Sequence, residues 1–138
     1  MQKNGEKRKV RVLVVDDEPH IRQLICLVVT SLGAEVVGEA SDGIQAVELY
    51  KEFSPEIVML DVNMPKLDGI SVLKKIMAIN PRALVVMLTS LDAIDVVKEC
   101  IDHGARNYIL KNLPAEELRQ LISETWGTYV AEIRDTAS

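Results

Sequence analysis

Five short apolar runs recur along the chain at nearly regular intervals, and this rhythm constrains the fold more than any other feature. The runs begin 22 to 26 residues apart and span residues 10–15, 35–38, 57–60, 83–88 and 106–110. They are rich in Val, Ile and Leu without polar alternation, which is typical of strands covered on both faces. Each interval has room for one strand and one helix, so the pattern predicts a parallel α/β sheet built from βα units.

The segments between the runs carry the spacing of amphipathic helices. Apolar residues recur three and four positions apart in segments 19–32, 42–50, 69–79, 92–103 and from residue 115 onward. Pro19 suits a first helical turn, and Gly33 suits the position just past a helix end. Five βα units are too few to close an eight-stranded barrel, so we expect an open, doubly wound sheet with right-handed crossovers. Such sheets bind ligands at the carboxyl ends of their strands.

Composition and charge exclude several classes of protein. The 138 residues suffice for one domain with its own core, without a disulfide or metal staple. With 21 acidic and 16 basic residues the net charge is −5, which argues against a basic surface for nucleic acid. No apolar run approaches the ~20 residues of a membrane span or follows the polar start as in a signal peptide. Cys26 and Cys100 form no CxxC motif, so we expect a protein of the reducing cytoplasm. From the charge and the lack of a long apolar run we expect no direct nucleic-acid or membrane partner.

The chain divides into a flexible basic tail, a folded domain and an extension of the last helix. These parts are predicted at residues 1–9, 10–126 and 127–138. The apolar stripe of the last helix passes through Gly127, so a helix from Ala115 to Arg134 would be about 30 Å long. Its end, with Tyr129 and Ile133, either projects and packs on another chain in a homodimer or folds back on its own domain, and Gly127 leaves a break open.

Polar residues follow four of the five predicted strands. They are Asp16, Asp17, Glu18, Asp61, Thr89, Ser90 and Lys111. Two carboxylates ~4 Å apart repel by about 4 kcal/mol at an effective dielectric near 20, so a cation must offset them. Hard oxygen ligands suit Mg²⁺, and no His or Cys stands at these strand ends to favour zinc. Acids with a Lys, a Thr and a metal ion suit phosphoryl transfer, in which one carboxylate attacks as nucleophile.

Each of these residues alone has an ordinary structural explanation. The first three acids suit the positive end of the following helix, and Asp61 suits an Asx-turn. Thr89 and Ser90 suit a helix N-cap, and Lys111 suits a solvated surface. The functional hypothesis depends on all of them occurring together, at matching strand ends.

Five separated motifs then occur in an order that identifies a family. They are Val12-Leu-Val-Val-Asp16-Asp17-Glu18-Pro19, Val58-Met-Leu-Asp61-Val-Asn63-Met-Pro65 with Asp68-Gly69, Leu88-Thr89-Ser90, Gly104-Ala105 and Tyr108-Ile-Leu-Lys111. From about Val10 to Trp126 the chain resembles the receiver domain of bacterial response regulators. The resemblance implies a flavodoxin-like fold, a five-stranded parallel sheet in the order 2-1-3-4-5, and a phosphorylation-activated role in two-component signalling. Because only four residues follow Arg134, we expect a stand-alone receiver without an output domain.

The resemblance also implies a role for each site residue. Asp61 accepts a phosphoryl group from a sensor histidine kinase or a histidine phosphotransfer protein. Asp17 and Asp61 bind Mg²⁺ directly, Asp16 helps through water, and the backbone carbonyl of Asn63 completes the protein ligands. Lys111 pairs with the phosphoryl group.

Two further residues form the expected switch. Phosphorylation adds about −1.5 to −2 charges and three acceptor oxygens, toward which the Thr89 hydroxyl can move. The vacated space admits the Tyr108 ring, although this ring also suits a filler of the groove between the last two helices. The face formed by the fourth helix, the fifth strand and the fifth helix then changes, and we expect a downstream protein target to bind there.

Two positions depart from the family pattern. Asn112 follows Lys111 where the family usually has Pro, often after a cis bond. A cis bond before a residue other than Pro costs about 3–4 kcal/mol, so either the bond is trans and Lys111 approaches differently, or strain is retained. Leu91, two residues after Thr89, stands where the family, together with Asn63, tunes loss of the phosphoryl group. Because Leu91 cannot orient water, we predict slow self-dephosphorylation.

Three other functions are weighed against this one. Haloacid dehalogenase-type phosphatases use a similar set of groups, but they place the nucleophile at the first strand and a second acid two residues later. Here Asn63 follows Asp61 at that distance and cannot act as general acid or base, so we expect no enzyme. A binding module independent of phosphorylation would not need the complete set of acids, Thr and Lys. A dinucleotide-binding unit would need a GxGxxG motif after the first strand, where none stands.

Overall fold

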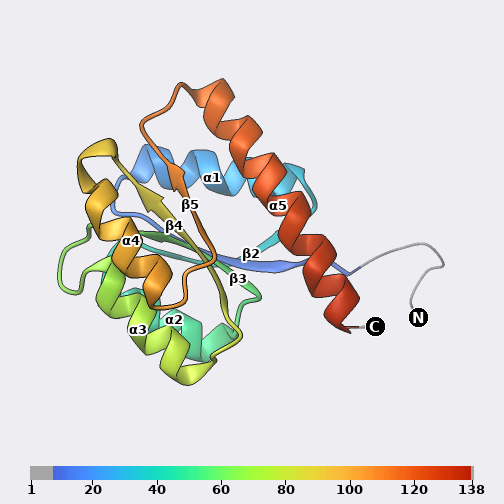
Figure 1. Ribbon diagram of the computed structural model, residues 1–138. Coiled ribbons are helices and arrows are strands. Elements are labelled where there is room, and N and C mark those ends of the chain that lie inside the picture. Colours follow the sequence, from blue (N-terminus) through green and yellow to red (C-terminus); the bar gives the residue numbers. More distant parts are fainter. Residues whose placement is uncertain (1–7, 138) are drawn as a thin grey trace.

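The computed structural model describes residues 8–137, and within them a parallel sheet lies between two layers of helices (Figure 1). The strands are β1 (Arg11–Val15), β2 (Glu35–Ala40), β3 (Ile57–Asp61), β4 (Leu84–Thr89) and β5 (Asn107–Leu110). Their order in the sheet is β2-β1-β3-β4-β5, and the four neighbouring pairs are all parallel. The predicted flavodoxin-like α/β fold is therefore confirmed.

Each strand is followed by a helix, as the spacing predicts. The helices are α1 (Pro19–Ser31), α2 (Gly43–Phe53), α3 (Gly69–Ile79), η1 (Leu91–Ala93), α4 (Ile94–Asp102) and α5 (Ala115–Ala137). The helix expected over residues 92–103 differs at its start, because it begins as the single 3₁₀ turn η1. The amide of Ala93 donates to the carbonyl of Ser90 at 3.1 Å, the i to i+3 bond of such a turn, and the Ser90 hydroxyl donates to the Asp92 carboxylate.

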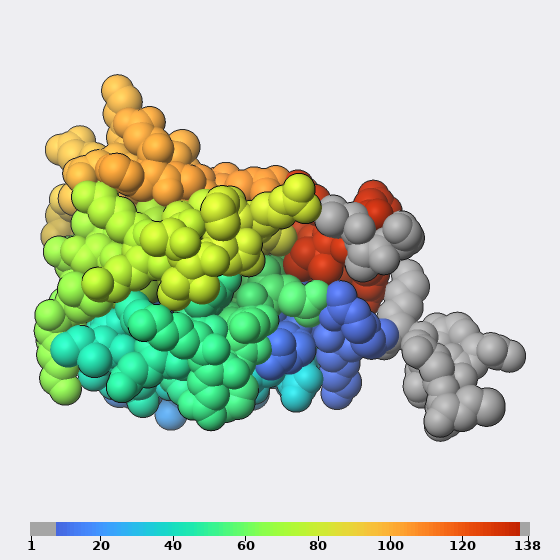
Figure 2. Space-filling view, turned by 90° about the horizontal axis from the view of Figure 1, so that it is seen from below, coloured from blue at the N-terminus to red at the C-terminus, as the bar shows by residue number. Residues whose placement is uncertain are grey.

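Alternate residues of the strands belong to the two different cores, one under each helix layer. Val12, Val14 and Met59 pack with α1 and α5, whereas Leu13 and Leu60 pack with α2, α3 and α4. Figure 2 shows the surfaces of α2 and α3 side by side on the second of these faces. Because both faces are covered, the central strands are apolar throughout, which explains their lack of polar alternation.

The end of α5 folds back on its own domain. The helix continues through Gly127 without a break, and Tyr129 and Val130 are buried in the same core as Val10. Ile133 packs against this core as well. The alternative in which Tyr129 and Ile133 project is wrong, because their apolar surface is needed to cover the amino-terminal edge of the sheet. The homodimer stays a prediction, without a projecting helix end to support it.

Other predictions about the chain ends have a limited outcome. Most of the predicted basic tail, positions 1–7, lies outside the described residues. Of its last two residues, Arg8 forms an ion pair with Glu56. Within residues 8–137, no helix is long and apolar enough to cross a membrane. The domain boundaries at residues 10 and 126 stay predictions.

One glycine controls how closely a helix approaches the carboxyl edge of the sheet. A Cβ on Gly69 would lie 2.2 Å from the carbonyl oxygen of Asp61 and 2.7 Å from the Cα of Val62. Only glycine therefore allows the start of α3 to lie against the end of β3. Asp68 caps this helix by accepting a hydrogen bond from the amide of Ser71 at 2.9 Å. The contact fixes the backbone on which Asp61 stands.

Candidate functional site

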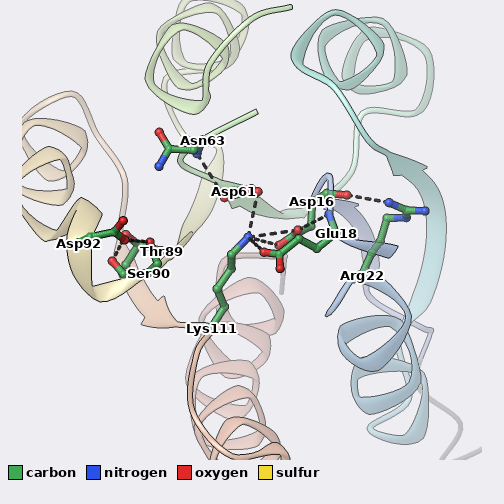
Figure 3. Close-up of polar contacts among 9 residues, drawn as sticks. All are labelled: Asp16, Glu18, Arg22, Asp61, Asn63, Thr89, Ser90, Asp92 and Lys111. Carbon is green, nitrogen blue, oxygen red and sulfur yellow. Dashed lines mark hydrogen bonds and ion pairs between the residues drawn. The ribbon is translucent and has the colours of Figure 1, made fainter. Parts of the chain in front are cut away.

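The carboxyl ends of neighbouring strands bring two aspartates together although they are far apart in the sequence. Asp16 directly follows β1 and Asp61 ends β3, and the two strands pair in register at Val15 and Leu60. Both aspartates are buried, with exposed fractions of 0% and 2%. Figure 3 shows their carboxylates facing one side chain, that of Lys111, which follows β5.

The Lys111 ammonium contacts three carboxylates at once. Its Nζ lies 3.1 Å from Oδ2 of Asp16, 3.0 Å from Oδ2 of Asp61 and 2.6 Å from Oε1 of Glu18 (Figure 3). The lysine is itself buried, and its amide donates to the carbonyl of Thr89 at 2.8 Å, which fixes the start of the side chain. One positive charge therefore stands against three negative ones, and the centre holds an excess of negative charge.

This excess shows in the pKa values of the buried groups. Burial, and after it the negative charge of Asp16, raise the pKa of the Asp61 carboxyl to about 7, although the charge and hydrogen bond of Lys111 act to lower it. Burial likewise raises the pKa of Asp16. Burial alone would lower the pKa of Lys111, but the hydrogen bond with Glu18 and the charges of both aspartates outweigh it and leave the pKa above its usual value. Lysine stays charged, and a second cation would relieve the remaining repulsion.

Backbone amides orient one oxygen of each buried aspartate. The amide of Glu18 donates to Oδ1 of Asp16 at 2.8 Å, and the amide of Asn63 donates to Oδ1 of Asp61 at 3.2 Å. The second contact is the Asx-turn that gave Asp61 an ordinary explanation, so the structural and functional interpretations hold together. This contact involves the amide of Asn63, and the role of its backbone carbonyl as a metal ligand stays a prediction.

The acidic cluster has the donors that a magnesium ion prefers. Asp16, Asp17 and Glu18 each offer a carboxylate oxygen within 4.8 Å of the others. Asp17 is exposed, and its carboxyl is a further, smaller cause that raises the pKa of Asp61. Two buried carboxylates with excess negative charge beside an exposed one fit a hard divalent cation that keeps part of its water. The residues present therefore fit Mg²⁺.

Thr89 and Tyr108 stand apart from the charged cluster. The Thr89 hydroxyl is buried and donates to the carbonyl of Ser90 at 3.0 Å, so it is bound within its own loop. Tyr108 on β5 is 41% exposed. Its role as switch ring and its role as groove filler both stay predictions.

The backbone after Lys111 has an ordinary trans peptide bond. Residues 8–137 contain no cis peptide bond, so the bond from Lys111 to Asn112 is trans. Of the two alternatives left open by Asn112, the structure therefore has the trans bond. The missing proline does not prevent the lysine side chain from entering the site.

Two features of the site were not predicted from the sequence. One is the close pair of Glu18 with Lys111, and the other is Arg22, whose Nη1 donates to the backbone carbonyl of Asp16 at 2.7 Å. A signal for Arg22 exists in the sequence. It stands in the first turn of a predicted helix, where the helix dipole disfavours a positive charge, so another contact must hold it there.

Comparison with known proteins agrees with these observations. The family model described as response regulator receiver domain matches residues 12–123. The chemotaxis protein CheY of Bacillus subtilis is 39% identical over 115 residues, which cover 83% of this chain and 96% of that protein. CheY of Thermotoga maritima is 42% identical over 101 residues, which cover 73% and 84% of the two chains.

Solved structures have the same fold. The receiver domain of the response regulator AraT from Geobacillus stearothermophilus has a TM-score of 0.82 and 26% identity, over 94% of this chain and 98% of that chain. A second match is a chain of the CheX–CheY–BeF3–Mg²⁺ complex from Borrelia burgdorferi. Its TM-score is 0.75 at 34% identity, over 85% of this chain and 89% of that chain.

Proposed function

The chain belongs to the family of response regulator receiver domains, and from this premise we propose that Asp61 is the residue that accepts the phosphoryl group. Receiver domains are regulatory modules that act in phosphorylation-activated two-component signalling. The observation that supports Asp61 most directly is its buried carboxylate, 3.0 Å from the Lys111 ammonium and next to Asp16. Asp16 is a poorer nucleophile, because both of its oxygens accept hydrogen bonds from Lys111 and one also accepts from the amide of Glu18.

The transfer itself needs little from the protein beyond an ionised carboxylate in the right place. An oxygen of Asp61 forms the new O–P bond while the N–P bond of a phosphohistidine breaks, and the electron pair of that bond goes to the imidazole nitrogen. Lys111 stays within reach of the acceptor and offsets the charge that the phosphoryl oxygens bring. The phosphohistidine belongs to a sensor histidine kinase or a histidine phosphotransfer protein.

Receiver domains bind Mg²⁺ at an acidic pocket, and we assign this pocket here to the carboxylates of Asp17 and Asp61, to Asp16 through water, and to the backbone carbonyl of Asn63. When bound, the ion neutralises part of the charge on the carboxylates and on the phosphoryl oxygens. The excess of acids over Lys111 supports this assignment. So does the presence of Mg²⁺ in the related CheY complex.

Phosphorylation changes the protein through Thr89 and Tyr108. The Thr89 hydroxyl leaves the carbonyl of Ser90 for a phosphoryl oxygen, and the exposed Tyr108 ring turns inward. The face of α4, β5 and α5 carries exposed apolar side chains that include Ile94 and Ile101, which suits a downstream protein partner. The free thiols of Cys26 and Cys100 agree with action in a reducing cytoplasm.

Labelling by a small phosphodonor tests the assignment. With acetyl phosphate and Mg²⁺, intact mass should show one phosphoryl group on the wild type and none on Asp61→Asn. Asp68→Asn, which alters an exposed helix cap, should be labelled like the wild type. Labelling of Asp61→Asn to the wild-type extent would overturn the assignment. Continuous turnover of p-nitrophenyl phosphate would instead support the phosphatase alternative.

A further inference from the structure

Arg22 contacts the acidic cluster from the side opposite Lys111 (Figure 3). Its Nη1 donates to the backbone carbonyl of Asp16 at 2.7 Å, and its Nε donates to Oε1 of Glu39 at 3.2 Å. Its own amide donates to the carbonyl of Glu18 at 3.0 Å, in the first turn of α1. The side chain is only 19% exposed. Arg22 thus connects the end of β1 to the start of α1 and to β2.

The position of this arginine is unfavourable unless the carbonyl contact matters. The positive end of the α1 dipole disfavours a cation in the first turn. The partner Glu39 is about half exposed, with a side-chain exposure of 49%, and such surface pairs contribute little to stability. The bond to the Asp16 carbonyl is short and charge-assisted, and it is partly buried. It is therefore the strongest contact that Arg22 makes.

The carbonyl that Arg22 holds belongs to the peptide between Asp16 and Asp17. Because a peptide is planar, fixing its oxygen also fixes the nitrogen and Cα of Asp17, and with them the point from which that side chain starts. On the other side, the amide of Asp16 donates to the carbonyl of Ala40 at 3.0 Å. The Asp16 carboxylate is held by Lys111 and by the amide of Glu18, whereas the Asp17 side chain is exposed, so the position of its backbone matters more for where its carboxylate lies.

From this geometry we infer that Arg22 is a positioning residue for the cation pocket, because it holds the peptide that aims the Asp17 carboxylate at an ion shared with Asp61. The inference rests on the proposed function only in placing Mg²⁺ at these carboxylates. It makes a prediction opposite to simple electrostatics. A positive charge beside the pocket repels a divalent cation, so charge alone predicts tighter Mg²⁺ binding when Arg22 is neutralised. Positioning predicts weaker binding.

Mg²⁺ affinity of the unphosphorylated protein, measured by isothermal titration calorimetry, decides between the two. We expect Arg22→Ala to weaken binding by about tenfold, as loss of residues that orient metal ligands generally does. Arg22→Lys keeps the charge and one donor and should recover part of the loss. Glu39→Gln leaves the Asp16 carbonyl contact in place and should stay within about twofold of the wild type. Urea unfolding of each variant in EDTA establishes that it is folded.

The outcomes separate this inference from the proposed function. If Asp17→Asn binds Mg²⁺ as the wild type does, the proposed pocket itself is wrong. If Asp17→Asn loses binding while Arg22→Ala binds as tightly as the wild type or more tightly, the pocket stands and the role of Arg22 is refuted. Should Arg22→Ala fail to fold, Arg22→Met is measured instead. It keeps the length of the side chain but has neither the charge nor the donor, and affinity equal to or above that of the wild type would refute positioning.

Discussion

Replacing Asp61 by Asn should stabilise the metal-free protein at high pH and do little at low pH. The Asp61 carboxyl is buried, and burial together with the charge of Asp16 raises its pKa from 3.8 to about 7. Because the pKa is higher in the folded state than in the unfolded chain, the folded protein binds this proton more tightly. The resulting stability is complete below about pH 4 and is lost as the pH rises through about 7.

The size of the effect follows from the same shift. Each unit of pKa corresponds to about 1.4 kcal/mol, so a shift of about three units corresponds to roughly 4 kcal/mol between the protonated and ionised states. Asparagine has no charge, and its amide oxygen can still accept from the amide of Asn63 and from Lys111. Because the Asp16 carboxylate stays buried beside the same lysine, part of the cost of burying charge persists in the variant. We therefore expect Asp61→Asn to gain about 2–4 kcal/mol at pH 8.

Urea unfolding in EDTA, followed by the fluorescence of the single tryptophan, measures this difference. The variant should unfold at higher urea than the wild type at pH 8, and the two curves should converge only as the pH falls to about 4. Asp68→Asn keeps a competent helix cap and should follow the wild type at both pH values. Mg²⁺ should stabilise the wild type and leave Asp61→Asn nearly unchanged. A difference that is absent at pH 8, or that does not vary with pH, would refute the reasoning.

Three other predictions concern backbone fit, a surface carboxylate and the phosphorylated state. Gly69→Ala should lower the free energy of unfolding in urea by about 2–3 kcal/mol, because its Cβ would collide with the Asp61 carbonyl. Gly127→Ala should raise it by about 0.5–1 kcal/mol, because its Cβ would meet no atom within 4 Å. The hydrogen bond from Arg8 lowers the pKa of Glu56, so Glu56→Gln should cost about 1 kcal/mol at pH 7 and less as the pH falls through that lowered pKa, as acid titration of unfolding would reveal. Leu91 is 70% exposed beside the site, and Leu91→Ala should shorten the acyl-phosphate lifetime measured by intact mass; unchanged decay would count against shielding by this side chain.

The fold could be predicted because its determinants are local. Strands buried on both faces are continuously apolar, helices alternate with them, and parallel strands must then end at one edge. That topology alone brings Asp16, Asp61 and Lys111 into one site, without any knowledge of side-chain geometry. The order of the strands in the sheet, by contrast, was predicted from the family resemblance and not from the spacing of the apolar runs.

The features that could not be predicted depend on contacts between residues that are far apart in the sequence. The contact between Glu18 and Lys111 requires the rotamers of two side chains from opposite ends of the chain. The end of α5 carries the same apolar spacing whether it projects or folds back. Only the uncovered edge beside Val10 favours the second arrangement, and that edge is not visible in a linear pattern.

Under the proposed assignment of Asp61 as acceptor, the pair of Glu18 with Lys111 is the contact that phosphorylation would change first. In the described state the lysine is shared by Asp16, Asp61 and Glu18, but only Glu18 is substantially exposed, with 46% of its side chain accessible. Its carboxylate can return to water at little cost, whereas the buried aspartates cannot. A phosphoryl group on Asp61 brings more negative charge than the carboxylate it replaces, so it competes for Lys111 most effectively against Glu18. Displacement of this one carboxylate therefore frees the lysine without exposing a buried charge, and it leaves the framework around Asp16 unchanged.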